Sequence, residues 1–299
     1  MAATINVNGR ISDQEHAVVP VFDHGFLYGE GVYETLRTYN GQPFLFERHM
    51  RRLRTSADML ALPIPLSNDE IATRFRDTMT AAKLGDGVHN EAYIRILVTR
   101  GVGELTYDPA ACPTSSVVVI VKPNADPPAS AFEQGVRVSL VPVVRNHPAT
   151  VNPLIKSNSL INNALGMQEA LRRGGFEGIM RNYKGELAEC TQSNLFLVKN
   201  GVALTPPVDA GLLPGITREF MFEIGAEAGI AVREAVLRDD DLFAADEAFL
   251  TSTTRELVPI VQVDEHTIGA GVPGPIGKAL LAGFRRAARK LTERHSTVS

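Results

Sequence analysis

Apolar and polar positions in the first third of the chain follow helical spacing in two segments and strand spacing around them. Residues 48–60 repeat apolar side chains every three or four positions, as one face of a helix does. Residues 68–84 form the second predicted helix, with Ser67 or Asn68 as its N-cap and Gly85 as its stop. A hairpin is predicted to turn at Asn6-Val7-Asn8-Gly9. The other strands predicted around these helices are residues 18–22, 44–46, 92–99 and 116–122.

The clearest break in the pattern is Lys122-Pro123-Asn124-Ala125-Asp126-Pro127-Pro128-Ala129. Its prolines disfavour both helix and paired strand, so we expect an interdomain linker over 123–135. This divides the chain into a small α+β domain, 1–122, and a larger domain, 136–299. The elements predicted in the larger domain are strands at 136–144, 178–181, 194–199, 202–205 and 247–251, and helices at 157–173, 217–228 and 275–294.

Composition narrows the function classes. The chain has 299 residues, 44% of them hydrophobic, and a net charge of −4, which indicates neither a nucleic-acid nor a membrane partner. The longest aliphatic run, Val117 to Val121, is too short to span a bilayer, and the first residues lack the pattern of a secretory signal. Cys112 and Cys190 can build neither a disulfide framework nor a four-cysteine metal site. We therefore expect a soluble, cytoplasmic enzyme.

Two N-terminal segments are more polar than a core requires. Residues 23–37 combine three glycines, two tyrosines and opposite charges, although a tight loop entering a half-exposed strand would look the same. Residues 47–54 carry four arginines, which are usually a solvated helix face. However, Arg52 is next to the apolar stripe at Leu53, where its guanidinium could turn inward to meet a phosphate.

Three later segments offer chemistry of other kinds. Lys156 follows two apolar residues at the entrance of a predicted helix. Partial burial there would lower the pKa of its amine and favour imine formation. The alternative is a snorkelling lysine, whose stem is buried while its charged end stays in water. A glycine turn leaves the N–H groups of Ile216 and Thr217 at a helix start, which is a ready anion site. Residues 251–256 add hydroxyls, although ordinary capping would also explain both loops. The sequence has no nucleotide-binding glycine loop after a strand and no nucleophile elbow. It also has no spacing typical of metal ligands, so no metal site is predicted.

Taken in this order, the segments resemble the class IV (fold type IV) pyridoxal-phosphate-dependent aminotransferases, closest to the branched-chain amino acid aminotransferases. The family also includes D-amino acid transaminases and aminodeoxychorismate lyase. The resemblance runs from about Val7 to Leu280. It implies a two-domain mixed αβ fold, with a small N-terminal α+β domain and a larger mixed-sheet domain that binds pyridoxal 5'-phosphate. It also implies a homodimer in which a small-domain loop completes the partner's active site.

The resemblance assigns roles position by position. Lys156 would hold the cofactor as an internal aldimine and move the substrate proton, and Glu189 would face the pyridine nitrogen. Arg52, in a His-x-x-Arg-Leu helix, would bind the phosphate together with Ile216, Thr217 and Thr253. The positions expected to contact substrate are Tyr28, Tyr33, Tyr93, Arg95 and Thr254.

The substrate signals are mixed. Tyr93-x-Arg95 resembles the branched-chain group, whereas Thr251-Ser252-Thr253-Thr254 resembles the D-amino acid group, and Leu160 stands where a tyrosine is usual. On a strand, Tyr93, Arg95 and Leu97 share a face, so Arg95 would meet a substrate carboxylate or form an ion pair with Glu34 or Glu104. We expect L-leucine, L-isoleucine or L-valine as donor and 2-oxoglutarate as acceptor. The alternatives are D-amino acid or (R)-amine transamination, the lyase reaction and a non-catalytic binding protein.

Overall fold

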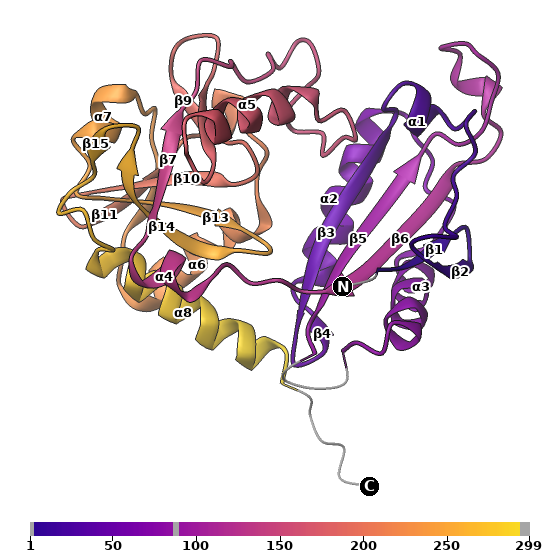
Figure 1. Cartoon of the computed structure of the whole chain (residues 1–299), viewed down its shortest axis with the longest axis horizontal. Coiled ribbons are helices and arrows are strands. Elements are labelled where there is room, and N and C mark those ends of the chain that lie inside the picture. The colour runs from indigo at the N-terminus through magenta and orange to yellow at the C-terminus, as the bar shows by residue number, and fades with distance from the viewer. Residues whose placement is uncertain (1–2, 86–89, 294–299) are drawn as a thin grey trace, which may run out of the picture. The chain divides into compact units, whose positions relative to one another are not determined.

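The computed structural model describes residues 3–85 and 90–293, which divide into two compact units (Figure 1). The first consists of Met1–Ala125, Ile155–Ser159 and Ala288–Ser299, and the second of Asp126–Leu154 and Leu160–Ala287. The five-residue segment around Lys156 therefore packs with the first unit, although the flanking chain belongs to the second. The linker over 123–135 stays a prediction, and a short helix, α4 (Ala129–Glu133), forms within that range.

The described part of the first unit contains a six-stranded antiparallel sheet in the order β2-β1-β6-β5-β3-β4. The hairpin predicted at Asn6–Gly9 is confirmed, because Asn8 and Gly9 take the left-handed φ values of 50° and 96° that such a turn needs. The strand bounds are β1 (Thr4–Val7), β2 (Arg10–Asp13), β3 (Gly31–Tyr39), β4 (Gln42–Pro43), β5 (Ala92–Thr99) and β6 (Ser116–Pro123).

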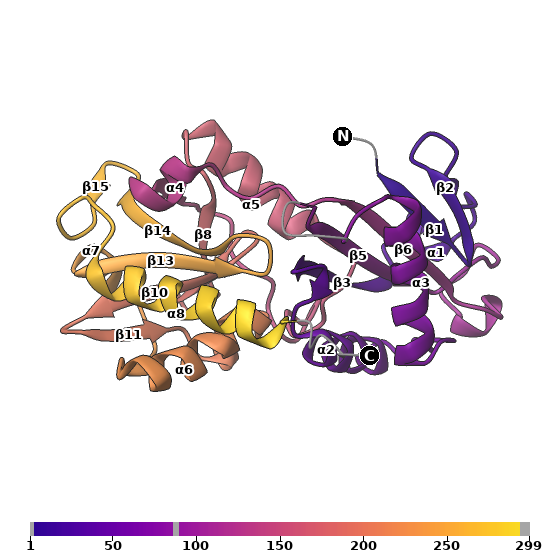
Figure 2. The same ribbon diagram turned by 90° about the horizontal axis from the view of Figure 1, so that it is seen from below.

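Helices α2 (Phe46–Met59) and α3 (Asn68–Ala81) cover one face of this sheet (Figure 2). Ser67, one of the two N-caps predicted for α3, is the observed N-cap, and it forms a capping box with Glu70. On β5 the predicted alternation is confirmed: Ile94 and Ile96 are fully buried against the helices, and the residues between them are half-buried on the other face. Two short helices complete the unit, α1 (His24–Leu27) and the 3-10 turn Pro109–Ala111.

Two strand predictions in the first unit are wrong. Residues 18–22 form no strand, and Val18 and Phe22 are 73% and 51% exposed. Pro20 in this run cannot donate to a ladder, which disfavours pairing. Residues 44–46 also form no strand, because Leu45 takes a left-handed φ of 52° and α2 begins at Phe46. Hydrophobicity alone does not distinguish such a helix start from a strand.

The described part of the second unit contains a mixed sheet in the order β12-β11-β10-β13-β14-β7-β8-β9, with β15 paired to β14. Three neighbouring pairs are parallel, namely β11 with β12, β14 with β7 and β7 with β8. The strand bounds are β7 (Val136–Leu140), β8 (Gly178–Arg181), β9 (Leu187–Cys190), β10 (Asn194–Lys199), β11 (Val202–Thr205), β12 (Val232–Glu234), β13 (Glu247–Ser252), β14 (Glu256–Val263) and β15 (His266–Thr267).

Helices α6 and α8 lie side by side beneath β10 and β13, with the Phe220 and Phe284 rings 5.8 Å apart (Figures 1 and 2). The remaining helix bounds in this unit are α5 (Ile161–Arg172), α6 (Ile216–Ala228), α7 (Asp239–Phe243), α8 (Pro275–Leu291) and the 3-10 turn Val208–Ala210. The end predicted for the last helix, Arg294, lies outside the described residues. Within the described ranges no helix is long and apolar enough to cross a membrane.

The helix predicted over 157–173 begins four residues later than expected, at Ile161. Ser157 forms a bridge with Val32 of β3, and the Asn158 N–H donates to the Gly31 carbonyl at 2.9 Å. Those residues therefore satisfy their backbone groups on a strand instead of in a helix. β7 likewise ends at Leu140, before Pro142, and not at Val144 as predicted.

Candidate functional site

The predicted site residues are carried by both units, and each set is described on its own. In the first unit, β3 points the Glu34 carboxylate at α2, where it is fully buried. Arg52 donates to it twice, from Nε to Oε1 at 2.7 Å and from Nη2 to Oε2 at 2.9 Å. His49 Nδ1 lies 2.7 Å from Oε2. The Arg52 guanidinium does turn inward, and the partner that fixes it is a carboxylate.

The charges of this cluster follow from its burial and its partners. Burial alone would raise the pKa of Glu34, but the neighbouring Arg52 and His49 outweigh it and hold that pKa well below its usual range. Burial lowers the pKa of His49, despite the attraction of Glu34. At neutral pH we therefore assign a neutral His49 ring whose Nδ1–H donates to an ionised Glu34.

Lys156 is fixed by its backbone on both sides. Its N–H donates to Ser56 Oγ of α2 at 3.1 Å, and its carbonyl accepts from the Tyr33 N–H of β3 at 2.9 Å. The half-buried side chain places Nζ 4.5 Å from the centre of the Tyr33 ring. The predicted helix entrance is wrong here, because Lys156 precedes an extended segment, whereas the partial burial expected of the residue is found.

Arg95 lies over the same aromatic ring. Its Cζ is 4.1 Å from the centre of the Tyr33 ring, which belongs to the neighbouring strand β3 and is diagonal to Arg95 in the ladder, because Tyr33 pairs with Leu97. Among the residues that the structure describes, Arg95 forms no ion pair, so the pairing with Glu34 or Glu104 is not found. The geometry brings an amine and a guanidinium to one tyrosine, and it leaves the guanidinium without a carboxylate.

The other two predicted tyrosines have different ring contacts. Tyr93 is two positions along β5 from Arg95, and Lys122 Nζ lies 5.0 Å from the centre of its ring. Tyr28 is the C-cap of α1 and is 36% exposed, with its ring 5.1 Å from that of Tyr107.

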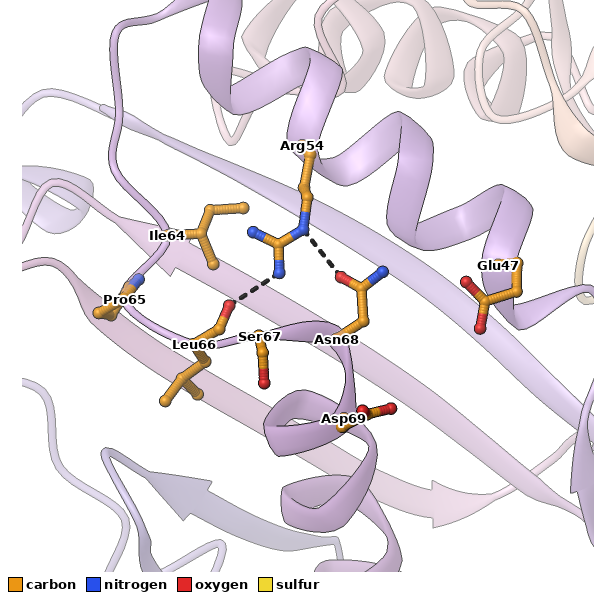
Figure 3. A pocket seen from close by; sticks show the side chains of 8 residues that line it. All are labelled: Glu47, Arg54, Ile64, Pro65, Leu66, Ser67, Asn68 and Asp69. Carbon is orange, nitrogen blue, oxygen red and sulfur yellow. Dashed lines mark hydrogen bonds between the residues drawn. The ribbon is translucent and has the colours of Figure 1, made fainter.

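The arginine side chains of α2 do not all point the same way. Arg54, two residues after Arg52, points to the start of α3, where it donates to Asn68 Oδ1 at 2.8 Å and to the Leu66 carbonyl at 2.7 Å (Figure 3). These contacts make it a brace between helices at the edge of a shallow hollow. Of these two arginines, Arg52 is the one turned to the sheet interior.

In the second unit, Glu189 is a buried carboxylate on β9 and is 5% exposed. Arg145 Nε donates to its Oε1 at 2.6 Å, and the Leu213 N–H donates to its Oε2 at 3.1 Å. The sequence reasoning missed Arg145. An arginine directly after the apolar run of residues 141–144 was the available signal, because such a residue needs a partner when it is buried.

The start of α6 has the features of an anion site. Ile216 and Thr217 form its first turn and are 4% exposed each, and the N-cap Gly215 provides no side-chain hydrogen bond. A Cβ on Gly215 would lie 2.0 Å from Asn194 Oδ1, so only glycine fits there. The helix therefore begins with its N–H groups uncovered by a capping side chain.

Thr253 and Thr254 form the half-buried turn between β13 and β14. Just before it, Thr251 pairs with Asn194 in the ladder, which puts the two side chains on the same face. Within the described part of the chain, the buried Thr251 Oγ1 has no hydrogen-bond partner. A polar atom in that state indicates a place for a further polar group.

The comparisons with known proteins agree with this geometry. The family model described as amino-transferase class IV matches residues 31–263. The chain is 40% identical over 281 residues to a Methanocaldococcus jannaschii protein provisionally named branched-chain-amino-acid aminotransferase, covering 94% of this chain and 95% of that one. A D-alanine aminotransferase of Bacillus licheniformis is 31% identical over 91% of this chain and 92% of its own length.

Solved structures give the same assignment. The crystal structure of the Escherichia coli branched-chain amino acid aminotransferase superposes with a TM-score of 0.91 at 33% identity, over 99% of this chain and 98% of that one. The two-domain mixed αβ fold expected from the sequence is thereby confirmed. The chain belongs to the class IV aminotransferase family.

Proposed function

We propose that this protein transfers an amino group between L-branched-chain amino acids and 2-oxoglutarate, with pyridoxal 5'-phosphate as cofactor. The observation that best supports this class of reaction comes from the second unit. There the buried Glu189 carboxylate accepts a hydrogen bond from the Leu213 N–H. Leu213 lies three residues before the uncapped start of α6. A buried carboxylate and a helix N-terminus suit a cofactor that has a basic ring nitrogen at one end and a phosphate dianion at the other.

The residues present fit this cofactor. The Thr251 hydroxyl is buried without a described partner, and the N-cap Gly215 leaves the start of α6 without a capping side chain. When bound, pyridoxal phosphate supplies an electron-accepting ring. Glu189 would keep a proton on the ring nitrogen, and Ile216, Thr217, Thr253 and Arg52 would bind the phosphate. The Lys156 amine would attach the cofactor and carry the proton at the substrate Cα.

The proposed substrate follows from Arg95. This guanidinium is half-buried on a strand, lies over the Tyr33 ring and has no carboxylate partner among the described residues. A substrate carboxylate would supply the missing charge, with Tyr28, Tyr33, Tyr93 and Thr254 as further contacts. A forked cation beside an aromatic ring can bind the second carboxylate of 2-oxoglutarate and leave room for an aliphatic side chain.

A second candidate is transamination of D-amino acids or (R)-amines on the same scaffold. The similarity to a D-alanine aminotransferase and the threonine-rich segment 251–254 favour it. Leu160, half-buried at the N-cap of α5, provides no hydroxyl where the branched-chain group has a tyrosine. Lyase chemistry on aminodeoxychorismate and a non-catalytic binding role remain outcomes that the experiment below can detect.

A homodimer is part of the proposal. In the first unit, two segments expose large apolar side chains and are joined by a bridge between Asp23 and Val102 and by a hydrogen bond from the Gly103 N–H to the Phe22 carbonyl. An apolar surface of this kind is typical of a protein–protein contact, and we assign it to a second copy of the chain. The exposed residues are Val18, Val19, Val21, Phe22, Phe26, Val102, Leu105 and Tyr107.

A cytoplasmic location is likewise proposed. It is supported by the two cysteines, Cys112 and Cys190, which are both free thiols.

The experiment that tests the function is a half-reaction screen. The yellow holoenzyme is mixed separately with L-leucine, L-glutamate, D-alanine, D-glutamate and an (R)-amine, and loss of the cofactor absorbance is followed. The proposal expects L-leucine and L-glutamate to bleach the band fastest. Faster bleaching by D-alanine or the (R)-amine would favour the second candidate. Pyruvate release from aminodeoxychorismate would indicate the lyase, and a colourless protein would indicate a binding role.

A further inference from the structure

Glu177 is a fully buried carboxylate in the second unit that the proposed cofactor contacts leave without a role. It directly precedes β8, and donors from two other segments converge on it. The Gln192 N–H and the Ser193 hydroxyl, at 3.0 Å, come from the loop after β9, which carries Glu189. The Arg255 guanidinium, at 2.5 Å, comes from the turn between β13 and β14. Glu177 therefore joins that loop to the turn.

Arg255 makes this connection through both of its terminal nitrogens. Its Nη1 binds Glu177, and its Nη2 donates to the side-chain oxygen of Gln192 at 2.8 Å. Its Cζ lies 4.9 Å from the centre of the Phe176 ring, which covers one face of the guanidinium. Burial raises the pKa of Glu177, and the neighbouring guanidinium opposes that shift. A planar fork can serve both acceptors at once, which an ammonium cannot do in the same geometry.

The next residue ties down the other end of the same turn. Glu256 takes a left-handed φ of 58°, which is unfavourable for a residue with a side chain. Its carboxylate accepts from Arg285 Nε of α8 at 2.7 Å. Among the described residues, the side chains of Thr253 and Thr254 form no hydrogen bond. The turn is thus fixed by residues 255 and 256, while its two threonines are left available.

We propose that Arg255 is a positioning residue which, by bridging Glu177 and Gln192, holds Thr253 and Thr254 in the arrangement that binds the cofactor phosphate and the substrate. The inference rests on the proposed function, because it takes these threonines as contacts of cofactor and substrate. A turn that is ordered before binding loses less conformational entropy when the anion arrives, so its affinity is higher. Arg255 acts only through the turn between β13 and β14 and through the loop after β9.

The test is an Arg255→Met variant, which keeps the length of the side chain and removes the fork. Apoenzyme is titrated with pyridoxal phosphate, and the dissociation constant is read from the absorbance of the bound cofactor. We expect it to rise roughly tenfold, the size of one lost charge-assisted hydrogen bond. With saturating cofactor, KM for L-leucine should rise more than kcat falls. Arg255→Lys keeps a charge beside Glu177 and should recover part of the cofactor affinity. This second variant also serves if the methionine variant fails to fold.

Two comparisons separate positioning from a general loss of structure. Arg181→Met removes a two-point ion pair with Asp239 in the same unit, at 2.8 and 2.6 Å, and should leave cofactor affinity unchanged. A Glu177→Gln, Arg255→Met double variant should bind the cofactor no more weakly than Arg255→Met alone. Wild-type affinity in both Arg255 variants, or equal weakening by Arg181→Met, would overturn the inference. A wild-type protein that binds no pyridoxal phosphate would instead overturn the proposed function.

Discussion

Arg52 on α2 holds Glu34 on β3 with two parallel hydrogen bonds, one to each carboxylate oxygen. Glu34 is fully buried inside the first unit and the Arg52 side chain is 11% exposed, and His49 adds a third donor to the same carboxylate. A two-point contact of this kind fixes the plane of the guanidinium as well as its position. Glu34 therefore sets the orientation of the arginine that we propose for the cofactor phosphate.

Replacing Glu34 with Gln should destabilise the protein strongly, because the Arg52 charge stays in the interior without its counter-charge. We expect the free energy of unfolding at pH 7 to fall by about 3 kcal/mol. The measurement is urea unfolding followed by circular dichroism. Glu169→Gln, which breaks ion pairs with Arg172 and Arg173 on the surface of α5, is the matched control and should cost less than about 1 kcal/mol. Equal losses in the two variants would contradict a buried charge pair.

The same pair gives a signed pH dependence. The folded-state pKa of Glu34 lies below its ordinary value of 4.5, so its stabilisation is complete above that value and is lost as the pH falls toward the folded pKa. The difference between wild type and Glu34→Gln should therefore be constant between about pH 6 and pH 8 and shrink below pH 4.5. A His49→Gln background removes the titration of the neighbouring ring. A difference that grows on acidification would show that the sign is wrong.

Glu189 is expected to act on chemistry more than on cofactor retention. Glu189→Gln keeps the shape of the side chain but loses the charge that would hold a proton on the ring nitrogen, an interaction of roughly 1.5–3 kcal/mol. We expect cofactor to remain bound while the half-reaction with L-glutamate slows by orders of magnitude in stopped-flow absorbance. Glu186→Gln, which changes a half-buried carboxylate that pairs with Arg238 just before β9, serves as control. An unchanged half-reaction rate would remove Glu189 from the proposed role.

Arg95 should discriminate between acceptors. Replacing it with Leu removes the fork that we propose for a substrate carboxylate, so kcat/KM for 2-oxoglutarate should fall far more than that for 4-methyl-2-oxopentanoate. Because the charge-assisted contact is worth roughly 1.5–3 kcal/mol, the ratio should change by about tenfold or more. Lys122→Met removes the cation that lies over the Tyr93 ring of β5 and should leave the ratio unchanged. Equal losses for both acceptors would place Arg95 outside the substrate contacts.

The apolar surface of the first unit should hold two copies together. Phe22→Ser combined with Leu105→Ser removes two of its exposed side chains, and light scattering should then show a shift toward monomer. Leu171→Ser removes an equally exposed leucine from α5 and should leave the mass unchanged. A wild-type protein that is monodisperse, monomeric and fully active would contradict the homodimer.

The pattern of residues along the chain was sufficient to predict features that depend on contacts between sequence neighbours. The alternation on β5, the N-cap at Ser67 and the hairpin at Asn8–Gly9 depend on residues that are neighbours in sequence, and each is confirmed. The start predicted for α5 was wrong because Ser157 and Asn158 pair with β3, more than 120 residues earlier in the chain.

The site shows the same division. The half-buried lysine and the uncapped start of α6 follow from short segments, and the structure has both. The partners of Glu34, Glu189 and Glu177 could not be predicted, because each carboxylate meets an arginine 18, 44 or 78 residues away in the chain. Such contacts depend on how strands and helices pack, which hydrophobic periodicity does not specify.

The proposed role of Lys156 is tested most directly by identifying the lysine that carries the cofactor. Holoenzyme is reduced with borohydride, which makes the link to the cofactor permanent, and the modified peptide is identified by mass spectrometry. We expect a single modified peptide that contains Lys156, and no trapped cofactor in Lys156→Ala. Cofactor found instead on Lys122, Lys184 or Lys199, or a Lys156→Ala variant that still traps it, would show that Lys156 is not the lysine that binds the cofactor.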